Sequence, residues 1–197
     1  MALADERYCS VDLETTGLNV KKDEILSFAS VPIRSSRIVV CDSYCTLIRP
    51  ENYKLEAMKY HGISKTDLDG ALPFSALADT ILHSLDGILV GHSVEYDYRF
   101  LKRYFKKIGV KFKKDFIDIN LVEKWLDQCC GKLGQTMPFE AIMKRYGLEA
   151  DYRHNALADA FFAAQVFQMQ MMRLEQLGIE SARQLIKAVN RCTYAIW

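Results

Sequence analysis

The first fifty residues predict β-strands. Segment 7–14 reads as a strand that ends in two carboxylates, and segment 24–33 is a nearly continuous apolar run, typical of a strand covered on both faces. Segment 37–50 is rich in β-branched and aromatic residues and closes with Pro50, so we predict a third strand there. The connection between the second and third segments is short, which favours an antiparallel hairpin.

From residue 73 onward, segments with the spacing of amphipathic helices alternate with short apolar runs. Buried strands are predicted at 87–92 and 115–120. Three meandering strands followed by strand–helix–strand units indicate an α/β fold, with a mixed five-stranded sheet (three antiparallel strands, then parallel strands) flanked by helices. The predicted helices are 73–85, 95–109, 121–129, 138–147, 155–178 and 180–189.

Size and composition are those of an ordinary globular chain. The 197 residues are half apolar and carry a net charge of +1, so we expect one domain, and the overall charge indicates no partner. The six cysteines lack metal-binding spacing, the N-terminus lacks a signal-like apolar segment, and no apolar run approaches bilayer length. We therefore expect a soluble cytoplasmic protein with free thiols.

Segment 102–114 departs from this neutrality because it carries seven Lys and Arg residues and almost no acid. Such a segment is usually a solvated face, and it also suits a surface that binds a polyanionic strand. The sequence leaves both interpretations open.

Two carboxylates, Asp12 and Glu14, stand two residues apart on the first predicted strand. Residues i and i+2 point to the same face of a strand, so these side chains lie close together. Like charges at that distance are costly unless a positive charge joins them, and a bound divalent cation is the simplest partner.

Asp97 and Asp159 each lie in the first turn of a predicted helix, on its apolar side. The helix dipole returns typically less than about 1 kcal/mol there, whereas desolvating an unpaired carboxylate costs several kcal/mol. His154 stands five residues before Asp159. Each feature alone has an ordinary explanation, as a solvated strand edge, a helix-capping charge or a structural histidine; together they indicate a functional site.

Three segments resemble, in order, the three motifs of the DEDDh 3′–5′ exonucleases: "VDLETTGL", "HSVEYDYRFL" and "HNALADA". That family includes the proofreading epsilon subunit of bacterial DNA polymerase III, RNase T and oligoribonuclease, and "YHGISKTDL" resembles its "HGI" segment. The epsilon-like branch is the most similar. The resemblance implies a ribonuclease H-like fold and a single exonuclease domain over residues 1–197. Its motif-bearing part runs from about 8 to 172, and a C-terminal helix and tail, 179–197, pack onto it.

The resemblance also implies roles for the acidic residues and the histidine. Asp12, Glu14, Asp97 and Asp159 match the metal-binding acids, and His154 matches the general base. Two divalent cations are expected, and oxygen-only ligands favour Mg²⁺ or Mn²⁺ over zinc. Imidazole suits a general base because its pKa lies near neutrality.

Five further positions match places where the family meets its substrate. The backbone around Thr15 meets the terminal 3′ hydroxyl, a side chain at the position of Leu18 wedges beside the last base, and His61 approaches from the "HGI" segment. In the second motif Ser93 replaces the usual Asn, which puts one substrate hydrogen bond in doubt. The expected substrate-binding residues are Thr15, Thr16, Leu18, His61 and Ser93.

We therefore expect a metal-dependent 3′–5′ exonuclease that releases nucleoside 5′-monophosphates from DNA. Its expected partner is a nucleic acid with a free 3′ end, single-stranded DNA above all, and no membrane. A homodimer and association with a polymerase are both left open. Three alternatives also remain open: an exoribonuclease of the RNase T or oligoribonuclease type, a non-catalytic nucleic-acid-binding module on the same fold, and a phosphatase for small phosphate esters.

Overall fold

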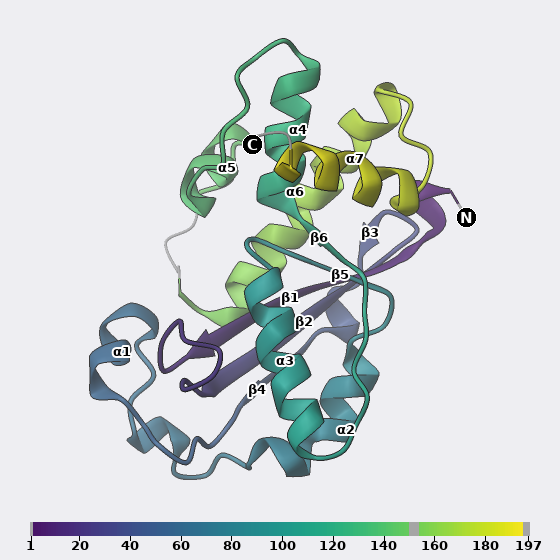
Figure 1. Ribbon diagram of the computed structural model, residues 1–197. Helices are drawn as coiled ribbons and strands as arrows, with labels where there is room; N and C mark the ends of the chain where they lie inside the picture. The colour runs from purple at the N-terminus through teal and green to yellow at the C-terminus, as the bar shows by residue number, and fades with distance from the viewer. Residues whose placement is uncertain (1, 150–153, 195–197) are drawn as a thin grey trace.

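A mixed β-sheet forms the centre of the molecule (Figure 1). The computed structural model describes residues 2–149 and 154–194, with side chains as far as residue 190. β1 pairs antiparallel with β2 and parallel with β5, and β5 pairs parallel with β6, in the order β3-β2-β1-β5-β6. This confirms the predicted topology. The strands are β1 (Arg7–Thr15), β2 (Ile25–Arg34), β3 (Arg37–Ile38), β4 (Tyr44–Leu47), β5 (Ile88–Gly91) and β6 (Phe116–Asp118).

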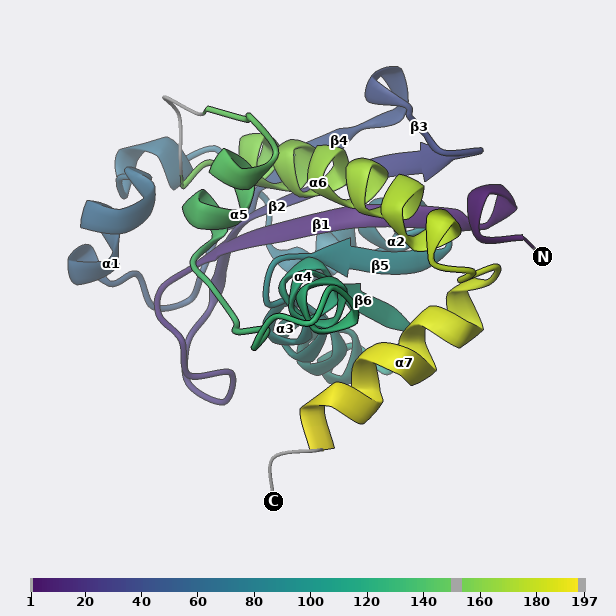
Figure 2. The ribbon, with the colours of Figure 1, turned by 90° about the horizontal axis from the view of Figure 1, so that it is seen from above.

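Helices cover both faces of the sheet, so the fold has three layers (Figures 1 and 2). α2 (Phe74–Ser84) and α3 (Glu95–Lys107) pack on one face. The opposite face carries α4 (Ile119–Cys129), α5 (Phe139–Arg145), α6 (Ala156–Gln176) and α7 (Ala182–Tyr194).

The alternation of side chains along β1 divides the strand between the two layers. Tyr8 belongs to the core beneath α6, while Cys9 and Val11 belong to the core beneath α2 and α3. Continuing by two from Tyr8 leads to Asp12 and Glu14, which therefore lie on the α6 side of the sheet.

The predicted third strand is wrong in one respect, because it is interrupted. β3 and β4 both pair antiparallel with β2, but a turn at Val40–Asp42 separates them. Pro32 of β2 explains the break. Its carbonyl accepts a hydrogen bond from the Val39 N–H at 2.9 Å, so its nitrogen faces the same neighbour and has no hydrogen to donate. The pairing cannot continue across that point, so the sheet has six strands among the residues that the structure describes.

The sequence analysis missed helix α1 (Leu55–His61). Seven residues are too few to show a helical period, so its apolar positions carry little signal. Gly62 ends the helix in the left-handed conformation, with φ of 70°, and its N–H bonds to the Met58 carbonyl at 2.8 Å. In both views α1 lies beside the carboxyl end of β1 (Figures 1 and 2), and His61 is the last residue of this helix.

The C-terminal helix α7 contributes Leu185 and Val189 to the core beneath α6. The tail at 195–197, expected to pack onto the domain, lies outside the described residues, and the single-domain assignment stays a prediction. No helix within residues 2–149 and 154–194 combines the length and the apolar character needed to cross a bilayer.

Candidate active site

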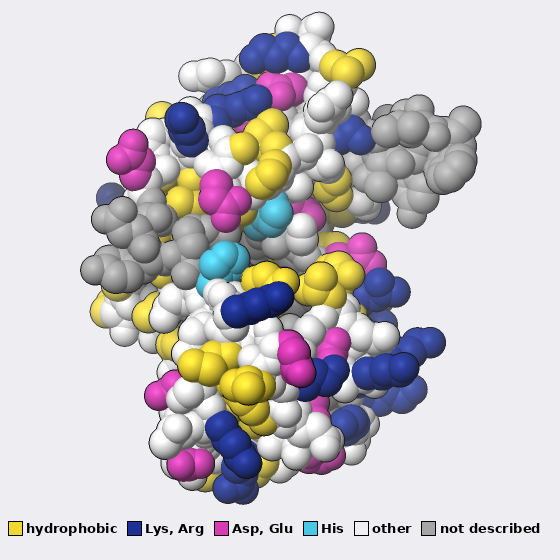
Figure 3. All heavy atoms as spheres, turned by 90° about the vertical axis from the view of Figure 1, so that its left-hand side faces the viewer, with side chains coloured by type: hydrophobic (Ala, Val, Ile, Leu, Met, Phe, Trp, Pro, Cys, Tyr) yellow, Lys and Arg dark blue, Asp and Glu magenta, His cyan; other side chains and the backbone are white. Residues whose placement is uncertain are grey.

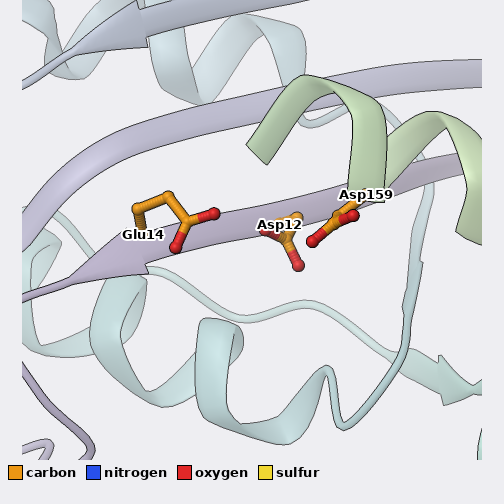
Figure 4. Close-up of side chains that lie close together, drawn as sticks. All are labelled: Asp12, Glu14 and Asp159. Atoms are coloured by element: carbon orange, nitrogen blue, oxygen red, sulfur yellow. The ribbon is translucent and has the colours of Figure 1, made fainter. Parts of the chain in front are cut away.

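Three carboxylates meet at the end of β1 (Figure 4). Asp12 and Glu14 project from β1 and Asp159 from the first turn of α6, and one oxygen from each lies within 4.8 Å of the others. Asp12 and Glu14 are half-buried and Asp159 is buried. The sheet alternation and the helical stripe identified from the sequence thus bring these side chains to one point.

Small side chains let α6 approach the sheet closely enough for this contact. Ala156, Ala160, Ala163 and Ala164 are all buried and form the stripe that begins beside Asp159. The separation of packed elements depends on the side chains between them, so alanines permit a short one. Asn155 caps the helix, and its side-chain oxygen accepts the Ala158 N–H at 3.2 Å.

Asp97 reaches the site from α3 on the opposite face of the sheet. It is 8% exposed and lines a pocket of about 340 Å³ together with Asp12, but it lies outside the tight group of three. Burial raises the pKa of Asp97 well above its usual value, and the charges of Asp118 and Glu14 raise it further against opposing backbone hydrogen bonds. The site therefore concentrates negative charge around a partly enclosed space.

Asp118 is a residue of this region that the sequence analysis did not identify. It ends β6 and accepts hydrogen bonds from the backbone N–H groups of Ser93 at 3.2 Å and Asn120 at 2.9 Å. Burial also raises the pKa of Asp118. The available signal was a carboxylate inside the predicted strand 115–120, three residues before the predicted helix 121–129, since such residues commonly cap helices.

Ser93 adopts the left-handed conformation, with φ of 57°, and is exposed in the turn between β5 and α3. The Asp118 carboxylate holds its backbone, and its hydroxyl lies 3.4 Å from Nδ1 of His92. The His92 ring stacks on Phe139, with ring centroids 5.2 Å apart. These contacts fix the turn that leads into Asp97.

His154 is exposed and adopts a φ of 63°. Its backbone N–H donates to Oδ2 of Asp159 at 3.2 Å, so the residue is attached to the acidic group. Burial lowers the pKa of His61, and the charge of His154 lowers the pKa of His61 further. The Nδ1 atom of His61 accepts the Ile63 N–H at 3.0 Å, which orients the ring.

The turn after β1 presents one apolar side chain to this space. Leu18 is 76% exposed and lines the same pocket as Asp12 and Thr15, whose hydroxyl donates to the Gly17 carbonyl at 2.8 Å. Thr16 is buried, and its hydroxyl accepts the Glu24 N–H at 2.9 Å. The Thr16 side chain thus stabilises the turn, while Thr15 and Leu18 face the pocket.

This donor set defines a class of site. Grouped carboxylates at the end of a central strand supply the hard oxygen ligands that divalent cations prefer. Without such an ion, their negative charges repel one another. The residues present therefore fit a metal centre, and the sheet topology is that of a ribonuclease H-like exonuclease fold.

Comparison with known proteins agrees with this class. A family model described as Exonuclease (RNase T) matches residues 10–167, so the chain belongs to that exonuclease family. It is 29% identical over 193 residues to the PolC-type DNA polymerase III of Thermotoga maritima, covering 96% of this chain and 14% of that protein. It is 28% identical over 175 residues to the DNA polymerase III epsilon subunit of Aquifex aeolicus, covering 84% and 80% respectively.

Among solved structures, the complex of E. coli exonuclease I with single-stranded DNA, in a zinc-bound form, superimposes with a TM-score of 0.76. The alignment has 17% sequence identity and covers 88% of this chain and 42% of that one. At this identity the likeness concerns the fold. The chain spans a small part of the polymerase relative and most of the epsilon relative.

Proposed function

We propose that this chain is a metal-dependent 3′–5′ exonuclease that removes nucleoside 5′-monophosphates from single-stranded DNA. The observation that carries the proposal is the meeting of Asp12, Glu14 and Asp159 within 4.8 Å, with His154 attached to Asp159 through its backbone. Family membership supports the reaction class, and the polymerase relatives support DNA as the polymer.

Asp12, Glu14 and Asp159 would hold a divalent cation, and Asp97 would complete the site for a second. Mg²⁺ or Mn²⁺ suits a donor set made of oxygens alone. Such ions, when bound, supply charge neutralisation at the scissile phosphate and lower the pKa of water.

The remaining residues would position the terminal nucleotide and move a proton. His154 would accept the proton of the attacking water, because its backbone is hydrogen-bonded to Asp159 of the acidic group and imidazole is a common general base. Leu18 would pack against the last base, with Thr15 and Ser93 along the pocket and His61 across from it. Thr16 would act through its backbone, since its side chain is buried.

We also propose that the chain is cytoplasmic and works beside a DNA polymerase. Two relatives support this association by name: a PolC-type DNA polymerase III, of which the chain spans 14%, and an epsilon subunit of DNA polymerase III, of which it spans 80%. A homodimer is the other assembly to test, and the mass of the protein in solution with and without a polymerase would distinguish the two.

The test is the shortening of a 5′-labelled single-stranded oligonucleotide in Mg²⁺, with an Asp12→Asn variant and with EDTA. We expect stepwise loss from the 3′ end for the wild-type chain and none in EDTA. The Asp12→Asn variant should lose at least a hundredfold in rate while its unfolding midpoint is unchanged or higher, because one of the crowded charges is gone. An Asp5→Asn variant, which changes an exposed acid outside the site, should keep full activity.

Undiminished hydrolysis in EDTA would contradict the metal requirement. The same assay on an RNA strand of identical sequence would decide between the DNA and RNA substrates.

A further inference from the structure

A second groove runs along α3 and joins the catalytic pocket. It encloses about 900 Å³, and Leu18 and Tyr96 line both this groove and the pocket that contains Asp12 and Asp97. Leu18 is 76% exposed and Tyr96 is 45% exposed, so both apolar surfaces are available at the junction. A strand whose end occupies the pocket can therefore continue into this groove.

The groove is basic because α3 places its cations on one stripe. Arg99, Lys102 and Lys106 are spaced three and four residues apart, so they share a face of the helix, while the opposite face is buried in the core. Lys21 adds a further cation from the turn after β1. Figure 3 shows Lys and Arg side chains gathered at the right-hand edge of the face that carries the histidines.

Among the residues that the structure describes, most of these cations have no strong partner. Arg99 faces Glu95 at 3.8 Å, but both side chains are more than 60% exposed, and an exposed pair of this kind contributes little. The Nζ atom of Lys102 lies 5.5 Å over the Tyr98 ring. Arg103, in contrast, donates to the Asp23 carbonyl and so fixes the turn that carries Leu18 and Lys21. The groove wall is thus preformed, and its charges remain accessible.

We propose that this groove binds the phosphodiester backbone of the single strand whose 3′ end lies in the catalytic pocket. The inference rests on the proposed function, because it concerns the continuation of the same substrate. Cations along a groove with aromatic rings at its sides are the features by which proteins bind single strands without reading their sequence. Tyr96 and Tyr98 supply rings on which bases can stack.

The length of α3 predicts which substrates are long enough to contact the groove. Its 13 residues span roughly 20 Å, and phosphates follow one another every ~3.4 Å or more along a strand. A dinucleotide therefore fills the pocket alone, whereas a strand of about 12 nucleotides also crosses the groove.

The experiment compares Lys102→Ala/Lys106→Ala with Lys111→Ala/Lys113→Ala. Both double variants remove two exposed lysines from the same segment, but Lys111 and Lys113 do not line the groove. The first variant should raise the KM for the longer strand about tenfold at low salt and reduce the salt dependence of log KM by about 1.4, since each single-strand phosphate contact contributes about 0.7. Its KM for the dinucleotide should be unchanged, and the control should change neither value.

Equal effects of the two double variants, or equal effects on long and short substrates, would contradict the proposal that the groove binds the strand. A second readout separates this result from failure of the proposed function. A fluorescent strand is titrated in EDTA with the Asp12→Asn protein, with and without the groove substitutions. If the wild-type chain degrades nothing but the groove substitutions weaken strand binding, the catalytic proposal fails and the groove stands. If the wild-type chain degrades the strand and the groove substitutions change neither hydrolysis nor binding, the groove fails and the catalytic proposal stands.

Discussion

The backbone of His154 holds this residue beside the acidic group, so the imidazole can be removed without releasing the segment. The N–H of His154 bonds to Asp159 at 3.2 Å with φ of 63°, a conformation that Asn tolerates better than most residues. A His154→Asn variant should therefore keep the local fold and lose the imidazole that we propose as the proton acceptor. We expect kcat to fall by about 10²–10⁴ with KM changed far less, measured on the 5′-labelled strand.

His83→Asn is the matched control, because His83 is an exposed histidine at the end of α2, on the far layer of the molecule. It should leave both constants unchanged. If His154→Asn raises KM and spares kcat, His154 contacts substrate and another group accepts the proton.

Periodicity explains which site residues could be predicted. A strand repeats every two residues and a helix every 3.6, so the faces of Asp12, Glu14, Asp97 and Asp159 follow from local sequence, and the structure buries both aspartates of the helices. Asp118 escaped prediction because its partners, Ser93 and Asn120, come from a neighbouring strand end and its own helix. The burial of the Thr16 side chain could not be predicted, because its hydroxyl accepts the Glu24 N–H across a loop, and loops show no sequence periodicity.

At the scale of elements, β5 begins where Gly87 passes the backbone of β1. Gly87 has φ of 93°, and an added Cβ would lie 2.1 Å from the Arg7 carbonyl oxygen. Gly87→Ala must therefore strain its own backbone and also displace the strand it faces. We expect it to lower the free energy of unfolding by about 3 kcal/mol or more, measured by denaturant titration.

Gly109→Ala separates these two effects. Gly109 ends α3 with φ of 76°, and its Cβ would meet nothing within 4 Å, so only the conformational cost of about 1–2 kcal/mol applies. Equal losses for the two variants would show that the close approach to Arg7 contributes nothing.

Long elements with a clear period were predictable, and short or interrupted ones were not. The extents of α3 and α6 lie within a few residues of those expected, since both carry long apolar stripes. The break between β3 and β4 arises from a missing donor on Pro32 of another strand. Helix α1 is stabilised by its glycine cap and its packing, and neither shows as a periodic pattern.

At the scale of the whole molecule, the strand order could be predicted because short connections favour antiparallel neighbours and helical crossovers favour parallel ones. The packing of α4, α5 and α6 against one another could not be predicted, because it depends on a buried polar cluster whose residues come from distant segments. Glu123 is fully buried at its centre. It accepts hydrogen bonds from Tyr146 at 2.6 Å, Arg145 at 2.8 Å, Gln170 at 2.9 Å and Arg173 at 3.1 Å.

This cluster makes stability depend on pH in a defined direction. Burial raises the pKa of Glu123, but hydrogen bonds from Tyr146, Gln170 and Arg145 outweigh it, so the pKa lies below the usual value. The unfolded chain then binds a proton more readily than the folded one. The stability supplied by ionised Glu123 is fully present above the unfolded pKa of about 4.3 and is lost as the pH falls through the lower folded pKa.

Glu123→Gln should therefore lower the free energy of unfolding by about 2–3 kcal/mol at pH 7, because it removes the buried carboxylate that pairs with Arg173 and that shares Arg145 with Asp127. The difference from wild type should begin to shrink as the pH falls below the unfolded pKa of about 4.3 and should go on shrinking until the pH passes the lower folded pKa. Denaturant titrations from pH 7 to pH 3 measure this difference in the free energy of unfolding. The control is Glu175→Gln, which neutralises an exposed carboxylate of α6 and should have little effect at any pH. A deficit that persists unchanged down to pH 3 would mean that Glu123 acts through its shape and packing, with its charge playing no part.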